Sequence, residues 1–252
     1  MAGRDDRGNV DTMHANAPTP SLGDPALLAV LVDPAAGAPE RTRALHLLGL
    51  RPCTESTLLA VLGPVRAVDA LEADLAALPS APRRGIVGSL HAVAVVGSLA
   101  PEFIAPEGLL VGVGTTGFAV DAPASWEKAV RAVRYATAPT RPVVFAADLG
   151  PFELLAARLR SSDIHGVEDI DAIDSVAAGP GGRGVVTALE TVAQAGSLRE
   201  AARVMCLHHT SVAARLSRAE QRLGYRVTTP SGMARLQLAL ALRRLRGTDL
   251  LA

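Results

Sequence analysis

The chain has 252 residues, of which 49% are hydrophobic and 3% are aromatic, and its formal net charge is zero. This length allows one large or two small domains, with a core of leucine, valine and alanine. No apolar run approaches the roughly 18 residues that a membrane helix needs, and the polar N-terminus has no signal-peptide core. We therefore expect a cytoplasmic protein that does not enter the membrane.

Strand and helix signals alternate over the first two thirds of the chain. Residues 1–24 show no hydrophobic periodicity, which predicts a disordered N-terminal tail. The expected strands are 26–32, 57–63, 109–114 and 142–146, together with a hairpin over 85–97. The expected helices are 40–50, 68–79, 125–136, with Ser125 as its N-cap, and 150–160. This alternation predicts an α/β domain over residues 25–160, in which helices cover a sheet.

An acidic segment joins this domain to a basic C-terminal part. Residues 161–182 predict a short helix and a flexible linker, and their run of acidic residues is typical of a solvated face. Residues 183–252 carry 11 arginines and 4 acidic residues, a net charge of +7, and residues 1–182 carry −7. A basic domain on an acidic body is the charge distribution expected of a nucleic-acid-binding module.

The C-terminal part has the pattern of a helix-turn-helix. A first helix over 185–196 ends at Gly196, and Ser197 begins the motif S-x-x-E, which predicts a capping box at the start of the next helix. The turn is "CLH" over 206–208, and the following helix begins at His209. Small residues at Ala201 and Ala202 suit two helices that cross closely. The expected core residues are Leu198, Ala201, Ala202, Met205, Val212, Leu216, Ala219, Leu223, Leu236, Leu240 and Leu242.

The same periodicity would suit any small helical bundle, so the charges matter. Arg215, Arg218 and Arg222 recur at i, i+3 and i+7 beside the apolar face of the second helix. Guanidinium groups in such a row can bind phosphates or the edges of bases. The row therefore favours nucleic-acid binding over a purely structural bundle.

The C-terminal part contains "GSLREAARVM", "CLH", "HTSVAARL" and "RLQLALALRRL", in this order. These motifs and their order resemble the helix-turn-helix of the PucR/CdaR family of bacterial transcriptional regulators. Residues 109–155 resemble the family's central domain, a degenerate relative of the GGDEF fold. The resemblance implies an α/β GGDEF-like domain over 25–160, an acidic helix or linker over 161–182, and an all-α helix-turn-helix domain over 183–252.

The resemblance implies that the protein is a transcriptional regulator that binds double-stranded DNA, with the helix from His209 in the major groove. The residues expected at or near bases are His209, Thr210, Ser211 and Arg215. The residues expected at phosphates, which position without specifying sequence, are Ser197, Arg218 and Arg222. A homodimer is expected, formed through residues 25–160 or through the acidic segment, because such motifs usually bind paired half-sites.

This sequence departs from the family pattern in two places. The family has Arg-Asn where His209 and Thr210 stand here, and a bulky or basic pair where Ala213 and Ala214 stand. These changes motivate an alternative, a degenerate regulator that acts as a protein-interaction module and no longer binds DNA specifically. Relatives also carry a sensory domain where this sequence has a largely polar segment of about 24 residues. We therefore expect any signal, from an unknown small-molecule or protein effector, to act on the GGDEF-like domain or a partner.

Three motifs suggest other chemistry, and the sequence disfavours each. The hairpin over 85–97 has no Asp or Glu, so it lacks the carboxylates with which a cyclase would hold Mg²⁺. "GVGTTG" over 112–117 matches a dinucleotide motif, but Pro123 separates it from the expected helix start at Ser125, which favours a turn. Cys206, His208 and His209 lie together without a fourth metal ligand. We expect no enzyme activity, no cofactor and no metal.

Overall fold

The computed structural model describes residues 25–78 and 80–248, and the expected disordered tail over 1–24 lies outside these ranges. Six strands form one sheet in the order β2-β3-β1-β4-β6, with β5 pairing with β1. All pairs are antiparallel except β4 with β6. The strands are β1 (Glu55–Leu62), β2 (Arg83–Val87), β3 (Leu90–Val96), β4 (Leu110–Val113), β5 (Gly117–Phe118) and β6 (Val143–Phe145).

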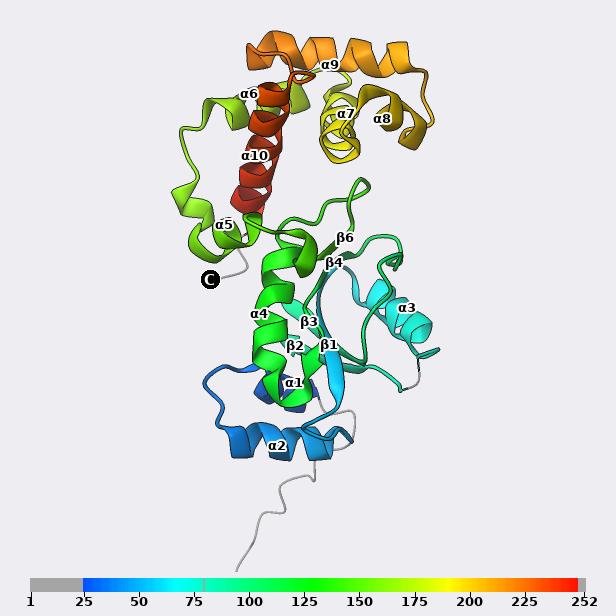
Figure 1. Cartoon of the computed structure of the whole chain (residues 1–252), viewed down its shortest axis with the longest axis vertical. Coiled ribbons are helices and arrows are strands. Elements are labelled where there is room, and N and C mark those ends of the chain that lie inside the picture. Colours follow the sequence, from blue (N-terminus) through cyan, green and yellow to red (C-terminus); the bar gives the residue numbers. More distant parts are fainter. Residues whose placement is uncertain (1–24, 79, 249–252) are drawn as a thin grey trace, which may run out of the picture.

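Helices cover both faces of this sheet (Figure 1). Along β1, Leu58 and Ala60 join one core with α1, α2 and α4, while Leu59 and Val61 join a second core with α3. Because both faces are covered, the second part of β1, from Leu58 to Leu62, is continuously apolar. The helices of this α/β body are α1 (Pro25–Val32), α2 (Ala38–Leu47), α3 (Val65–Leu75), α4 (Ala122–Val133) and α5 (Phe152–Arg158), with short 3₁₀ turns at η1 (Ala119–Asp121) and η2 (Ala146–Asp148).

Two of the three glycines of "GVGTTG", Gly112 and Gly114, allow close helix packing. A Cβ atom at Gly112 would lie 2.1 Å from the carbonyl oxygen of Ala129, and one at Gly114 would lie 2.2 Å from that of Ser125. Both contacts are with the backbone of α4, so only glycine lets this helix approach β4 so closely. The expected strand-end turn is therefore part of a close helix–sheet contact.

A helical domain follows the body and lies at one end of it (Figure 1). It consists of α6 (Glu168–Ala178), α7 (Gly182–Ala195), α8 (Leu198–Val204), α9 (His209–Leu223) and α10 (Pro230–Gly247), after a 3₁₀ turn η3 (Ser161–Asp163). Helix α10 enters two cores, because Leu236 and Leu240 pack in the helical domain and Leu245 packs in the body. The mixed α/β part followed by a helical part confirms the expected fold class.

Arg134 fastens the end of α10 to the body. This residue at the C-terminus of α4 is fully buried, with 0% of its surface exposed. Its guanidinium donates hydrogen bonds to the carbonyl oxygens of Thr248 at 3.2 Å, Leu245 at 3.4 Å and Leu159 at 2.9 Å. A buried charge thus meets several carbonyl oxygens that the helix ends leave without intrahelical partners.

Two local predictions in the body are wrong. Residues 26–32, expected as a strand, form α1, with Leu28, Leu31 and Val32 buried at helical spacing. Ser125 does not cap α4, which begins at Ala122 with proline in its first turn. The Ser125 hydroxyl instead accepts a hydrogen bond from the backbone of Leu58 at 3.1 Å, and so joins α4 to β1.

The acidic segment also differs from its prediction. Its helix exists as α6, but only residues 179–181 separate α6 from α7, and Gly182 already lies inside α7. The carboxylate of Asp169 accepts two hydrogen bonds from Arg235, at 2.6 and 2.7 Å, and that of Asp174 accepts one from Arg243 at 2.7 Å. The expected solvated face is therefore ion-paired with α10, and the expected flexible linker is a tight connection.

Candidate nucleic-acid interface

The pair α8 and α9 begins with one half of the predicted capping box, the N-cap at Ser197. The Ser197 hydroxyl oxygen accepts a hydrogen bond from the backbone N–H of Glu200 at 3.2 Å. The Glu200 carboxylate contacts Arg203 on the surface of α8. Ala201 and Ala202 are buried between the helices, at 0% and 5% exposure, which confirms that small side chains occupy the contact.

The turn between α8 and α9 depends on two residues. Cys206 has a φ of 53°, a left-handed conformation that is uncommon for residues other than glycine. The next helix begins after His208, whose Nδ1 accepts a hydrogen bond from the backbone N–H of Thr210 at 3.4 Å. His208 therefore acts as the N-cap of α9. Among the described residues, no group of three metal-binding side chains lies close enough to hold an ion.

The inward and outward faces of α9 differ sharply. Val212, Leu216, Ala219 and Leu223 are buried, as predicted, and attach the helix to its domain. The residues on the opposite face are all exposed and uncharged, namely Thr210, Ala214, Ser217 and Gln221. Sequence reasoning missed Ser217 and Gln221, although their spacing from Thr210 and Ala214 places them on the same side of the helix. This outward face is narrow and composed of small or uncharged polar groups.

The three arginines of α9 lie along one edge of this face. Arg215 is half-buried and donates to the carbonyl oxygen of Gly184 at 3.4 Å, and Arg218 donates to that of Pro180 at 3.4 Å. Both therefore point toward the start of α7. Arg222 is exposed, and its guanidinium has no hydrogen bond or ion pair among the residues that the structure describes. The three arginines therefore form the expected row, but Arg215 and Arg218 also hold α9 against the start of α7.

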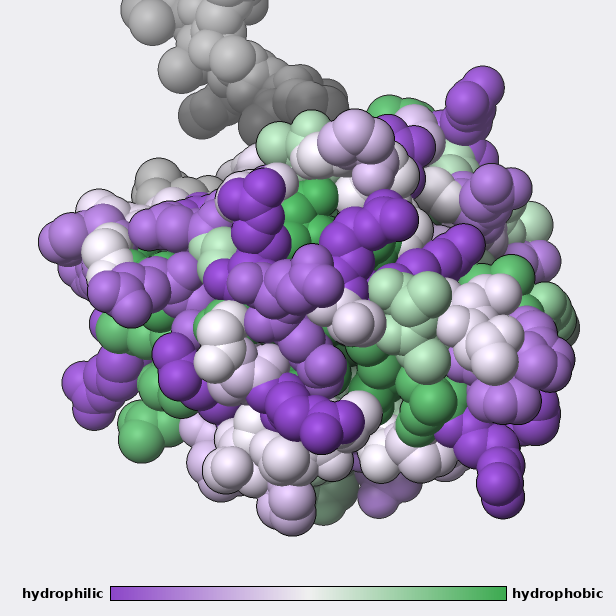
Figure 2. Space-filling view, turned by 90° about the horizontal axis from the view of Figure 1, so that it is seen from above, coloured by the Kyte–Doolittle hydropathy of each residue, from purple (hydrophilic) through white to green (hydrophobic). Residues whose placement is uncertain are grey.

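The other expected contact residues gather at the start of α9. His209, Thr210 and Ser211 are all exposed, and the imidazole rings of His208 and His209 lie 4.2 Å apart. Ser197 is exposed at the start of α8. Seen from above, this end of the molecule presents mainly hydrophilic side chains (Figure 2).

Ion pairs neutralise some arginines of the helical domain and leave others unpaired. On α10, four arginines are paired with acids: Arg235 with Asp169, Arg243 and Arg246 with Asp174, and Arg244 with Glu190. By contrast, the exposed arginines near α7, α8 and α9 that have no ion pair within the described ranges are Arg183, Arg199, Arg218, Arg222 and Arg226. Acids of α6, together with Glu190 of α7, thus neutralise the arginines of α10 and leave the side of α9 positive.

Residues 185–242 match the family described as the PucR C-terminal helix-turn-helix domain. The chain carries a PucR-type helix-turn-helix domain. The match spans most of α7, all of α8 and α9 and most of α10, so α9 is the third of the four helices that it covers. A PucR-type domain indicates a transcriptional regulator.

One solved structure similar to the chain is a regulator of polyketide synthase expression from Bifidobacterium adolescentis. The two chains are 20% identical, the similarity covers 88% of this chain and 91% of the other, and the TM-score is 0.34. No curated protein sequence matches this chain. Within the described residues, no helix combines the length and apolarity needed to cross a membrane.

Proposed function

We propose that this regulator binds double-stranded DNA with its PucR-type domain and inserts α9 into the major groove. The observation that carries the proposal is the outward face of α9, which is exposed, uncharged and bordered by arginines without acidic partners. A helix bearing small polar groups can approach base edges closely, while nearby guanidinium groups meet the phosphates. Asp169 and Asp174 of α6 are paired with arginines of α10, so these two acids do not oppose the proposed binding.

The start of α9 supplies the proposed base contacts. His209, Thr210 and Ser211 are exposed in its first turn, and hydroxyl and imidazole groups can bond to base edges. Gln221 extends the same face, and a glutamine amide can bond to adenine through both of its ends. The proposed sequence preference therefore rests on short polar groups together with this one longer amide.

The arginines and Ser197 have positioning roles in this proposal. Arg218 and Arg222 border the face and suit phosphate contacts, as does Ser197 at the start of α8. We keep Arg215 as a contact at or near a base, but its bond to Gly184 holds it beside α7. To contact DNA, the Arg215 guanidinium must release or share its long hydrogen bond to Gly184. An effect of replacing Arg215 on DNA binding therefore includes the loss of support for α9.

The regulator is proposed to act as a homodimer. A single helix-turn-helix makes few base contacts, and two-fold related copies read paired half-sites about one helical turn apart. The expected contact surfaces are residues 25–160 or the acidic segment. Light scattering on the full chain, free and with a mapped DNA site, measures the mass, and a monomer in both states would contradict the dimer.

The alternative is a protein-interaction module that no longer binds DNA specifically, and Ala213 and Ala214 favour it because they offer no hydrogen-bonding group. Genome-wide mapping of bound sites, followed by binding titrations with one mapped duplex and a scrambled duplex, separates the two functions. A preference for the mapped duplex supports the regulator. Equal affinity for both duplexes supports the alternative.

We further propose that the body has no cyclase activity, since the hairpin β2–β3 carries no Asp or Glu. Purified protein supplied with GTP and Mg²⁺ is then expected to form no cyclic dinucleotide. Product above the background of a heat-denatured sample would contradict this part of the proposal without affecting the DNA-binding part.

A further inference from the structure

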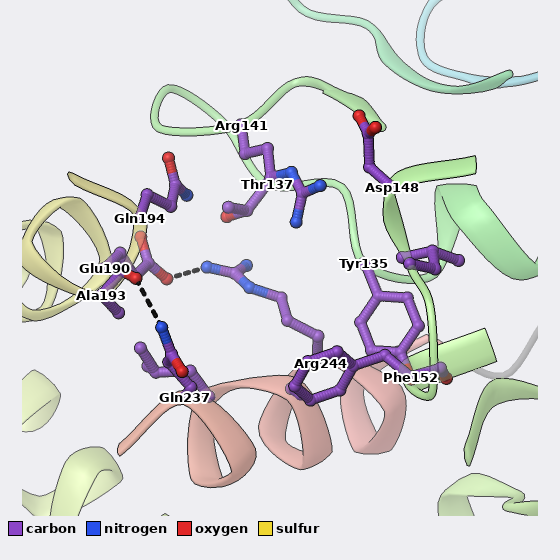
Figure 3. Close-up of a pocket in the computed structure, with 13 residues that line it drawn as sticks. Tyr135, Thr137, Arg141, Asp148, Phe152, Glu190, Ala193, Gln194, Gln237 and Arg244 are labelled. Carbon is purple, nitrogen blue, oxygen red and sulfur yellow. Dashed lines mark hydrogen bonds and ion pairs between the residues drawn. The ribbon is translucent and has the colours of Figure 1, made fainter. Parts of the chain in front are cut away.

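A cavity lies between the α/β body and the helical domain (Figure 3). Its volume is about 240 Å³, and it is partly open to solvent. The body contributes the segments around Tyr135, Arg141 and Phe152, and the helical domain contributes α7 and α10. This volume is smaller than the roughly 300–1,000 Å³ of pockets that hold drug-sized ligands, so only a small molecule fits.

One charge in the wall is already balanced. Arg244 of α10 forms an ion pair with Glu190 of α7, and Glu190 also accepts a hydrogen bond from the Thr140 hydroxyl at 3.0 Å. Burial lowers the pKa of Arg244 to about 10, so the guanidinium is still protonated at neutral pH. This pair closes one side of the cavity and leaves no net charge there.

Arg141 is different, because nothing in the described chain pairs with its guanidinium. Its backbone bonds to Thr137, but its side chain makes no hydrogen bond or ion pair with any residue in 25–78 or 80–248. Figure 3 shows this guanidinium directed into the cavity. Burial lowers the pKa of Arg141, and Asp148 at the edge opposes that change. A bound anion would give this half-buried guanidinium a charged acceptor and offset the effect of its burial.

Apolar and aromatic groups form the wall opposite. The rings of Tyr135 and Phe152 meet edge to face, with centroids 6.2 Å apart. The Tyr135 hydroxyl donates a hydrogen bond to the carbonyl oxygen of Phe152 at 2.6 Å. Tyr135 therefore contributes its apolar ring, and not its hydroxyl, to the wall of the cavity. Leu240 adds an aliphatic surface from α10. The cavity thus combines a single unpaired cation with flat apolar walls.

We infer that this cavity binds a small organic monocarboxylate, with its carboxylate on Arg141 and its apolar ring against Tyr135 and Phe152. Arginine binds a carboxylate through two parallel hydrogen bonds. A monoanion fits better than a phosphate dianion, since Arg141 is the one unpaired cation in the described wall and Asp148 lies at its edge. Because both domains supply walls, an occupied cavity holds α7 and α10 against the body.

The test uses the full chain and benzoate, with the neutral amide benzamide as a probe of the same shape. Calorimetry is expected to show one benzoate per chain, and about tenfold weaker binding of benzamide, since a charge-assisted hydrogen bond is lost. Arg141→Gln should weaken benzoate about tenfold and leave benzamide unchanged. Arg66→Gln, at an exposed arginine of α3, is the matched control and should change neither.

Inorganic phosphate and a second readout complete the test. Phosphate is expected to bind more weakly than benzoate, and phosphate binding that equals or exceeds it would overturn the preference for a monocarboxylate. The amide NMR signals of Phe152 and Gln194, one from each domain, should shift together on titration with benzoate. No benzoate binding, equal benzoate affinity after Arg141→Gln, or shifts on one side alone would overturn the inference. None of these outcomes depends on DNA binding, so the proposed function can fail separately.

Discussion

The Thr140 hydroxyl donates a hydrogen bond to the Glu190 carboxylate at 3.0 Å, across the boundary between the body and the helical domain. The same carboxylate pairs with Arg244, and Glu190 is only 7% exposed. A loop of the body and two helices of the other domain therefore meet at one buried acid. This contact fixes how α7 and α10 lie against the body.

Replacing this acid should destabilise the protein. Glu190→Gln is expected to lower the free energy of unfolding by about 2 kcal/mol, because it leaves Arg244 with an uncompensated, largely buried charge. Thr140→Val removes only one hydrogen bond and should cost about 1 kcal/mol. Urea unfolding of both variants measures the difference, and two equal losses would show that the ion pair adds nothing beyond the hydroxyl contact.

A single negative charge on the outward face of α9 tests whether this face contacts DNA. Ala214→Glu places a carboxylate where the proposed function puts DNA, and should weaken binding to a mapped duplex by about 100-fold or more. The fold should persist, because Ala214 is exposed. Ala73→Glu, at an exposed position of α3, controls for the added negative charge. If both variants bind DNA equally well in fluorescence titrations, α9 does not face the groove.

Arginines with and without acidic partners should differ in their salt dependence. Arg222→Ala removes an unpaired guanidinium, and should weaken binding to all sequences alike and reduce the slope of log affinity against log salt by about one. Arg243→Ala removes a guanidinium that is bonded to Asp174, so the slope should stay unchanged. Titrations at several salt concentrations measure both slopes. Equal slopes for the two variants would contradict the proposed division of charge.

Asp174 should make stability depend on acid pH. Burial tends to raise its pKa, but hydrogen bonds from Arg243 and Arg246 outweigh this effect and hold the pKa below its ordinary value of 3.8. A pKa that is lower in the folded state gives stability that is complete above the ordinary value and is lost as pH falls through the folded value. Between about pH 5 and 3, wild type should therefore lose more stability than Asp174→Asn. Parallel unfolding curves across this range would count against the pairing.

The buried guanidinium of Arg134 should be among the costliest to remove. Arg134→Met removes the guanidinium that donates to the carbonyl oxygens of Thr248, Leu245 and Leu159, and should lower the free energy of unfolding by about 3 kcal/mol or more. Arg131→Met, three residues earlier on α4 and partly exposed, removes surface ion pairs and should cost under about 1 kcal/mol. Thermal or urea unfolding measures both, and a mild effect at Arg134 would refute this account of its hydrogen bonds.

Local patterns predicted most elements, and the failures have specific causes. The motif from Ser197 to Leu223 could be predicted because its cap, its small residues and its apolar stripe all lie close together in the sequence. Residues 26–32 could not be assigned by length alone, since a short apolar run suits a buried strand or a buried helix. The spacing of Leu28, Leu31 and Val32 was the available signal for α1.

The remaining errors concern contacts between distant segments. Ser125 looks like a helix cap, but its hydroxyl serves the backbone of Leu58, which lies 67 residues away. The acids of α6 look solvated because their arginine partners are on α10. In the candidate site, the spacing of Arg215 and Arg218 predicted their row, but not that the start of α7 would lie within their reach.

Helix α10 limits how far the PucR-type helix-turn-helix domain can be separated from the body. A hybrid protein made by joining residues 183–252 to an unrelated body would keep Leu236 and Leu240 in place but deprive Leu245 of the core in which it is fully buried. The carbonyl oxygens that Arg134 serves would lose their donor in the same step. Exchange of this helical domain between related proteins should therefore succeed only when the end of α4 from the same protein is transferred with it. The helical domain and the end of α4 would then be inherited together.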